Sequence, residues 1–174
     1  CRPYQQPFPL PPLGCTVLSP ANIKVGERLP LVVMLHGFNT SPDQEMTAGN
    51  WDAAVVHDRV IVEFPESNAA SWNAGACCGL SQGAGANDVA YLQKVVTDAK
   101  ARPEVDRSRV FMVGNSNGGM MTYRYLCDHA GELAGAASVE GTRVAGCTPT
   151  RPIPFLHVAG LADEREEAAE RIAV

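Results

Sequence analysis

The sequence predicts an α/β fold in which a mostly parallel sheet carries helices on both faces. Two patterns predict it. Continuous apolar runs at 31–35, 60–64 and 110–113 are typical of strands buried on both sides, and amphipathic helical patterns separate them. Strands that alternate with helices in this way favour a parallel sheet. No internal repeat and no domain boundary is visible, so we expect a single domain over residues 1–174.

The predicted strands lie between prolines and glycines. Residues 1–28 are expected to hold a proline-rich segment and edge strands. The strand at 31–35 ends at His36-Gly37, and the strand at 60–64 is stopped by Pro65. After the strand at 110–113, two more are expected, at 136–139 and 153–158.

The predicted helices follow apolar residues at helical spacing. We expect them over 48–58, from Asn87 or Asp88 to a point before Pro103, from about 118 to 129, and over the charged, alanine-rich stretch 163–174. Asn87 and Asp88 are both suited to cap a helix N-terminus. Residues 66–86 are rich in glycine, serine, asparagine and alanine, which predicts a long loop.

The composition narrows the class of protein. Hydrophobic residues make up 45% and charged residues 19% of the chain, which is typical of a globular domain with a core. No apolar run is long enough to form a transmembrane helix. The net charge is −5 and lysine and arginine form no block, so nucleic acid is not an expected partner.

The even number of cysteines, six, indicates an oxidising compartment with two or more disulfides, and the alternative is that some of them are buried thiols. None has the spacing of a zinc site or of a C-x-x-C redox motif. Cys77 and Cys78 are neighbours, and we expect each to pair elsewhere in the chain rather than with the other. Two interpretations stay open for Cys1: the lipid-anchored first residue of a mature bacterial lipoprotein, or the start of a fragment.

The strongest chemical signal is Gly114-Asn115-Ser116-Asn117-Gly118. The pattern G-x-S-x-G is common by chance, but here it lies between an apolar strand and a helix, as a nucleophile elbow requires. Glycine permits the sharp turn, and the helix N-terminus favours developing negative charge. We predict Ser116 as a nucleophile. The alternative is an ordinary strand–helix turn with a capping serine.

An oxyanion hole is predicted beside this serine. His36-Gly37-Phe38 follows the first buried strand, and the loop at this place donates one backbone amide in an α/β-hydrolase. The residue after the nucleophile, Asn117, donates the other. The His36 side chain itself is expected to pack and fix the turn.

Asp163 is the candidate for the acid of a catalytic triad. It follows the strand at 153–158, and the order serine, acid, histidine is that of α/β-hydrolases. The alternative is an aspartate that caps the last helix. All four histidines (His36, His57, His129 and His157) precede Asp163, so we identify no general base, and we expect the domain to be incomplete at its C-terminus.

Together these motifs resemble the polyhydroxybutyrate depolymerase and feruloyl esterase family, which includes bacterial lipoprotein esterases. The matching stretches are LPLVVMLHG (29–37), SWNAGACCG (71–79), NDVAYLQKVV (87–96), DRSRVFMVGNSNGGMMTYRYLC (106–127) and PIPFLHVAGLAD (152–163). The combination of WNAGACCG with GNSNGGMM is the most specific part. The chain departs from the family at Ala159, where members often carry a second histidine, and after Asp163.

The resemblance implies an α/β-hydrolase fold and a secreted carboxylic ester hydrolase with a Ser-Asp-His triad and no cofactor or metal. Carried over, Ser116 is the nucleophile, Asp163 the acid, and the amides of Phe38 and Asn117 the oxyanion hole. Trp72 corresponds to a family tryptophan near the site and is expected to line the substrate cleft, with plain core packing as the alternative.

Two functional hypotheses follow. The first is an esterase that acts through an acyl-enzyme on feruloyl-type or polyhydroxyalkanoate-type esters, with an acyl transferase as its close variant. The second is a non-catalytic or truncated hydrolase-like domain that binds an ester or a glycan. A histidine on a loop after Asp163 would distinguish the first from the second.

Overall fold

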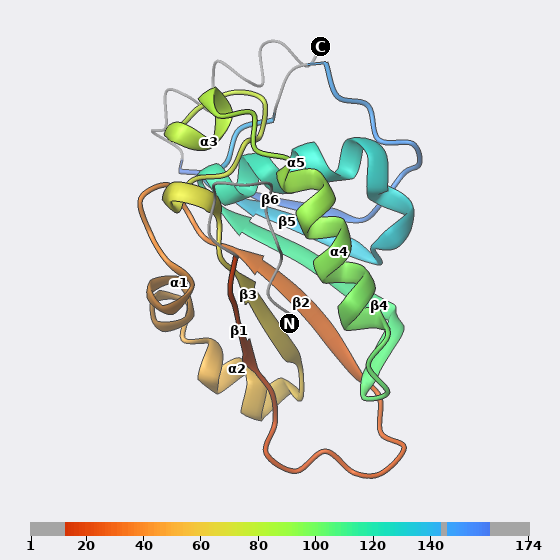
Figure 1. Cartoon of the computed structure of the whole chain (residues 1–174). Coiled ribbons are helices and arrows are strands. Elements are labelled where there is room, and N and C mark those ends of the chain that lie inside the picture. The colour runs from red at the N-terminus through yellow and green to blue at the C-terminus, as the bar shows by residue number, and fades with distance from the viewer. Residues whose placement is uncertain (1–12, 144–145, 161–174) are drawn as a thin grey trace.

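The computed structural model describes residues 13–143 and 146–160, which form one six-stranded sheet flanked by helices (Figure 1). The strands are β1 (Cys15–Leu18), β2 (Leu29–Leu35), β3 (Ile61–Pro65), β4 (Val105–Asn115), β5 (Gly135–Val139) and β6 (Phe155–Val158). Their order is β1-β3-β2-β4-β5-β6. β1 pairs antiparallel with β3, and all other neighbours are parallel. The predicted mostly parallel sheet is confirmed.

Helices lie on both faces of the sheet (Figure 1). One face carries α4 (Asp88–Lys100) and α5 (Asn117–His129), and the other carries α1 (Pro42–Ala48) and α2 (Trp51–Asp58). The side chains of β2 alternate between the two cores. Leu31, Val33 and Leu35 pack in the larger core with α4 and α5, whereas Val32 and Met34 contact the smaller core with α2. Both faces of β2 are largely covered, with only Pro30 and Val32 partly exposed, which explains why this strand is apolar throughout.

The face that carries α1 and α2 has an open part over β4, β5 and β6. A hollow of about 410 Å³ lies there, and its lining is almost entirely apolar: Val32, Phe111, Val113, Gly135, Ala136, Ala137, Pro154, Phe155 and Leu156. Leu156 is 61% exposed. We call this part of the surface the open sheet face.

Some elements differ from those predicted. The helix expected over 48–58 begins only at Trp51, as α2, and a separate helix that was not expected, α1, ends at Ala48. The chain turns between them at Gly49 and Asn50, and Asn50 has a left-handed φ of 50°. β4 begins before its apolar run, since Val105 already pairs with Leu29. The expected loop 66–86 contains two short turns of helix, η1 (Asn68–Ala70) and α3 (Leu80–Gly83), and η2 (Ala130–Glu132) follows α5. The helix expected over 163–174 lies outside the described residues.

Disulfides are present, but their pairing differs from the expectation at one place. Cys127 bonds to Cys147, which ties α5 to the segment before β6. Cys77 and Cys78 bond to each other, so the expectation that they pair elsewhere is wrong. Their Cα atoms lie only 3.2 Å apart in the exposed loop after Trp72, close enough for neighbouring sulfur atoms to meet. Cys1 lies outside the described residues.

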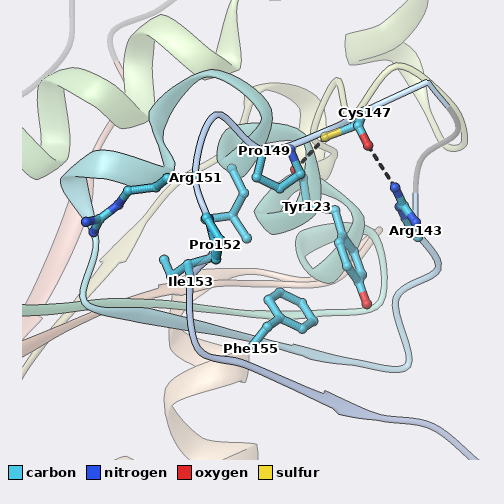
Figure 2. Close-up of a pocket in the computed structure, with 9 residues that line it drawn as sticks. Tyr123, Arg143, Cys147, Pro149, Arg151, Pro152, Ile153 and Phe155 are labelled. Carbon is cyan, nitrogen blue, oxygen red and sulfur yellow. Dashed lines mark hydrogen bonds between the residues drawn. The ribbon is translucent and has the colours of Figure 1, made fainter.

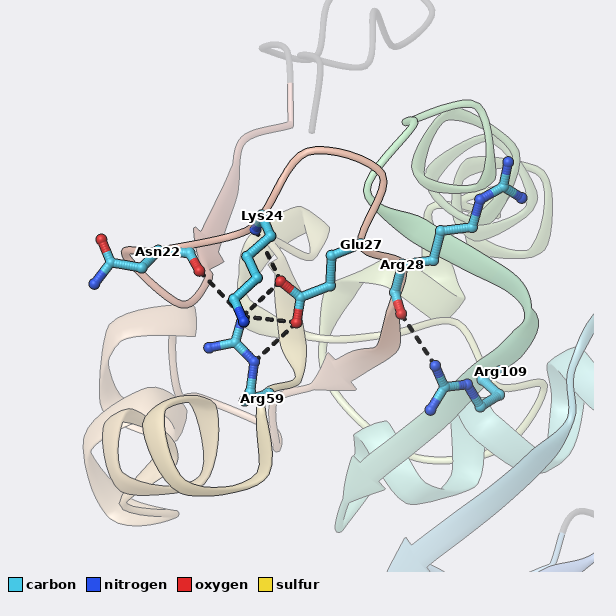
Figure 3. Close-up of polar contacts among 6 residues, drawn as sticks. All are labelled: Asn22, Lys24, Glu27, Arg28, Arg59 and Arg109. Carbon is cyan, nitrogen blue, oxygen red and sulfur yellow. Dashed lines mark hydrogen bonds and ion pairs between the residues drawn. The ribbon is translucent and has the colours of Figure 1, made fainter.

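A polar cluster holds the long connection between β1 and β2 (Figure 3). The guanidinium of Arg59 donates to both carboxylate oxygens of Glu27 and to the Asn22 carbonyl, and the Lys24 amide donates to Glu27 as well. These hydrogen bonds, that from the Lys24 amide first, lower the pKa of Glu27. Glu27 and Arg59 lie just before the amino ends of β2 and β3, whereas Ser116 follows the carboxyl end of β4.

Candidate active site

Ser116 lies at a sharp turn between β4 and α5. Its backbone has φ 50° and ψ −116°, a conformation that residues other than glycine rarely adopt and that costs about 1–3 kcal/mol. The Ser116 N–H donates to the Val139 carbonyl (2.7 Å), and the Ser116 carbonyl accepts from the Met120 N–H (3.0 Å). The turn is thus fixed on one side by β5 and on the other by the helix.

The glycines of the motif are required by space. A Cβ atom on Gly114 would lie 2.1 Å from the carbonyl oxygen of Gly118, and one on Gly118 would lie 2.3 Å from that of Leu35. A Cβ atom on Gly119 would lie 2.4 Å from Ser138 Oγ. Helix α5 therefore begins in close contact with the ends of β2 and β5, which leaves no space for a side chain at the glycines on either side of the strained residue Ser116.

The turn His36-Gly37-Phe38 lies against the elbow. A Cβ atom on Gly37 would be 3.6 Å from Ser116 Cβ, so the backbone that leads into Phe38 is next to the serine. Thr40 Oγ1 donates to the Gly37 carbonyl (2.8 Å) and closes the turn. The Phe38 side chain remains 46% exposed. The structure thus brings the two predicted amide donors, Phe38 and Asn117, into the same neighbourhood as Ser116.

Asn117 has a second role that sequence analysis did not foresee. It is the first residue of α5, where backbone amides have no acceptor within the helix. Its buried side chain accepts from the Trp72 N–H (2.7 Å) and donates to the Trp72 carbonyl (3.2 Å). This pair of bonds joins the elbow to the loop after β3.

Trp72 is fully buried, which corrects the expectation that it lines a cleft. Its indole N–H donates to the His36 carbonyl (2.9 Å), and its ring stacks on Tyr91 at 6.4 Å between centroids. The side chain therefore packs in the larger core, as the alternative interpretation has it, and is hydrogen-bonded to the turn His36-Gly37-Phe38.

His36 is held at both ring nitrogens. Nδ1–H donates to the Gly37 carbonyl (2.8 Å), and Nε2 accepts from the Ser67 N–H (3.2 Å). Burial lowers its pKa, so the ring is neutral. This arrangement suits a structural histidine that fixes the turn.

The other histidines lie on elements that do not bring them to the serine. His57 contacts Asp58 at the exposed end of α2, and His129 contacts Glu132 beyond the end of α5. His157, on β6, hydrogen-bonds through Nδ1 with the Tyr123 hydroxyl (3.0 Å). No hydrogen bond joins a histidine to Ser116 in residues 13–143 and 146–160.

Asp163 lies outside the described residues. The strand before it, β6, ends close to the elbow: the Glu140 N–H donates to the Val158 carbonyl (2.7 Å), one residue along from the Val139 carbonyl that holds Ser116. β6 therefore ends at the same edge of the sheet as Ser116.

Glu45 is a buried carboxylate that sequence analysis did not single out. It lies on α1 and accepts hydrogen bonds from Asn115 Nδ2 (3.4 Å) and from the Gly37 N–H. Burial raises its pKa, and these two bonds oppose the rise. Glu45 therefore joins Asn115, the residue before Ser116, to Gly37. A lone glutamate in a polar helical stretch carries no pattern by which to find it.

Comparison of the sequence with known proteins shows which esterases the chain resembles. No protein-family model matches the chain. It is 32% identical over 148 residues to a putative esterase of Nocardia uniformis subsp. tsuyamanensis (83% of this chain, 43% of that protein). It is 27% identical over 160 residues to feruloyl esterase B of Piromyces equi (84% and 28%), and 29% identical over 118 residues to poly(3-hydroxyalkanoate) depolymerase C of Paucimonas lemoignei (64% and 28%). The chain is therefore similar to members of the polyhydroxybutyrate depolymerase and feruloyl esterase family.

Solved structures agree on the fold of the chain. The chain is similar to a thermostable esterase with a TM-score of 0.71 (17% identity, 99% of this chain, 49% of the other). It is similar to an acetyl xylan esterase from Aspergillus awamori with a TM-score of 0.60 (19%, 80% and 52%). The predicted α/β-hydrolase fold is thereby confirmed. The chain spans less than half the length of the three relatives named above.

One pocket of the described residues lies apart from the predicted site. A hollow of about 470 Å³ lies between α5 and the segment that follows Cys147 (Figure 2). Its apolar wall includes Tyr123 and Phe155, whose rings are 4.6 Å apart, and Arg143 donates to the Cys147 carbonyl at its rim. None of the predicted site residues lines it.

Within residues 13–143 and 146–160, no group of three or more histidine, cysteine, aspartate or glutamate side chains is placed to hold a metal ion. None of the helices described there is long and apolar enough to cross a membrane.

Proposed function

We propose that the protein hydrolyses carboxylic esters of the feruloyl or polyhydroxyalkanoate type through an acyl-enzyme on Ser116. The observation that carries the proposal is the strained backbone of Ser116 at a strand–helix elbow, next to the turn at Phe38. Strain of this kind is retained where the position of a side chain matters for function. The feruloyl esterase and polyhydroxyalkanoate depolymerase relatives support the same class of reaction.

In the proposed reaction, Ser116 Oγ attacks the ester carbonyl and the alcohol departs, which leaves an acyl-serine that water hydrolyses to the acid. The backbone amides of Phe38 and Asn117 stabilise the oxyanion, and each such donor contributes about 2.7–4 kcal/mol to catalysis. Asp163 is the acid that orients the general base. The rings of the four histidines are held by neighbours other than Ser116, so the base is the part of the triad that the described residues do not supply.

We also propose that the protein acts outside the cytoplasm. Disulfides persist in oxidising compartments, and the described chain forms one between Cys77 and Cys78 and one between Cys127 and Cys147.

The experiment is hydrolysis of p-nitrophenyl acetate and methyl ferulate by the chain and by its Ser116→Ala variant. Mass spectrometry of the quenched reaction identifies an acyl group on Ser116. We expect acylation of Ser116 in the parent chain and none in the variant. If hydrolysis persists unchanged in Ser116→Ala, the nucleophile is assigned wrongly. If the chain binds these esters but never becomes acylated, the non-catalytic binding hypothesis replaces the esterase.

A further inference from the structure

An exposed apolar rim lies in front of the elbow. We define the rim as Phe38, the Cys77–Cys78 disulfide and Leu80. Phe38 is 46% and Leu80 74% exposed, and Cys77 is exposed as well. Exposed apolar groups that come together on a surface mark a place where another molecule binds. The loop and α3 lie above the carboxyl ends of the parallel strands, where the elbow also lies (Figure 1).

Close contacts connect the rim to Ser116. The Gly37 Cβ position is 3.6 Å from Ser116 Cβ, and Phe38 is the next residue. A Cβ atom on Gly79 would lie 2.7 Å from Phe38 Cε2, so the Phe38 ring rests on the backbone of Gly79. Cys78 and Leu80 are the residues on either side of this glycine. The left-handed φ of 74° at Gly79 and the lack of space for a side chain bring the loop directly against the ring.

The loop that carries the rim is held in place by buried polar contacts. Ser81 Oγ donates to the carbonyls of Asn68 (2.6 Å) and Ser71 (2.7 Å), and its amide donates to Ser71 Oγ (3.2 Å). Gln82 Nε2 donates to the Gly75 carbonyl (3.1 Å) across the turn that contains the disulfide. Because Trp72 is bonded to Asn117, the base of the loop is also fixed to the elbow. A surface fixed in this way is preorganised for binding.

We propose that the rim binds the apolar group attached directly to the ester, an aryl or alkyl group, while the carbonyl lies at Ser116. This inference rests on the proposed function. If the Phe38 amide faces the carbonyl oxygen, its ring lies within one side-chain length of the reacting carbon. The disulfide and Leu80 extend that apolar surface outward, and the polarisable sulfur atoms suit contact with hydrocarbon or an aromatic ring.

The test measures binding without turnover. In a Ser116→Ala background, the dissociation constant of intact p-nitrophenyl butyrate is measured by NMR titration for the chain, for Leu80→Ser and for Val56→Ser. Val56, on α2, is the matched control because it is also 74% exposed. We expect Leu80→Ser to raise the dissociation constant about fivefold to tenfold, from the loss of apolar contact, and Val56→Ser to leave it unchanged.

The double variant Cys77→Ser, Cys78→Ser adds a second measurement, with circular dichroism to confirm folding. A folded double variant is expected to bind as weakly as Leu80→Ser. If it does not fold, Leu80→Ser alone decides. Equal dissociation constants for Leu80→Ser and Val56→Ser overturn the proposal. Failure of the proposed function is seen separately, because the parent chain would then bind the ester with the same dependence on the rim while Ser116 is never acylated.

Discussion

Replacing Asn117 by alanine tests whether the elbow and the loop are joined as the structure has them. The substitution removes the acceptor of the Trp72 N–H and the donor to the Trp72 carbonyl, at a residue that is 1% exposed. Each buried backbone group left without a partner costs about 1–3 kcal/mol. We expect the free energy of unfolding to fall by about 3 kcal/mol, which for a chain of this size lowers Tm by roughly 6–12 °C.

The assay is equilibrium unfolding in urea, followed by tryptophan fluorescence and circular dichroism, with the slope compared between variants. Asn22→Ala is the control, because the Asn22 side chain is exposed, and its effect should stay within about 0.5 kcal/mol. The reasoning is refuted if Asn117→Ala and Asn22→Ala have the same stability, since the two bonds to Trp72 would then contribute nothing.

Three other outcomes are expected. Ser116→Gly should raise the free energy of unfolding by about 1 kcal/mol, because it relieves the left-handed strain at the expense of some chain entropy, and a decrease in the urea midpoint would contradict this. Gly118→Ala should lower the free energy of unfolding by about 2 kcal/mol or more, because its Cβ would meet backbone oxygens. The control Gly83→Ala, where nothing lies within 4 Å, should change it by less than about 0.5 kcal/mol. Similar melting temperatures for the two variants would refute the close packing of Gly118. The folded-state pKa of His36 is below the unfolded value of 6.5, so the unfolded chain takes up the proton first as the pH falls. The stability that neutral His36 contributes is therefore present above pH 6.5 and lost below it, and the difference in unfolding free energy between the parent and His36→Asn should shrink from pH 7.5 to pH 5.5. A difference that stays constant with pH would exclude this mechanism.

The parts of the fold that were predictable depend on local pattern. The apolar runs at 31–35 and 110–113 mark strands whose residues are all buried or partly buried, so that no position favours a polar side chain. The elbow was predictable because its glycines are dictated by contacts that every turn of this kind must make. The start of β4 was not, since residues 106–109 are polar and mostly exposed and form an irregularity between the Val105–Leu29 and Val110–Leu31 pairs.

The details of the candidate site that were missed depend on residues far apart in the chain. Trp72 meets Asn117 across 45 positions, and Glu45 meets Asn115 across 70. Nothing in the neighbourhood of either residue indicates such a partner. The bond between Cys77 and Cys78 was missed for a different reason, because the general expectation that neighbouring cysteines pair elsewhere in the chain does not hold in this loop.

The open sheet face is an apolar surface separate from the proposed ester site, and it bears on the solubility of the chain. Leu156 exposes hydrocarbon to water there, and the partly buried side chains of Val32, Phe111 and Val113 line the same hollow. Salts that are excluded from protein surfaces strengthen the burial of such groups, and urea weakens it. Solubility of the chain should thus fall with sulfate concentration more steeply than its charge of −5 alone would suggest, and replacing Leu156 by a charged residue should restore it.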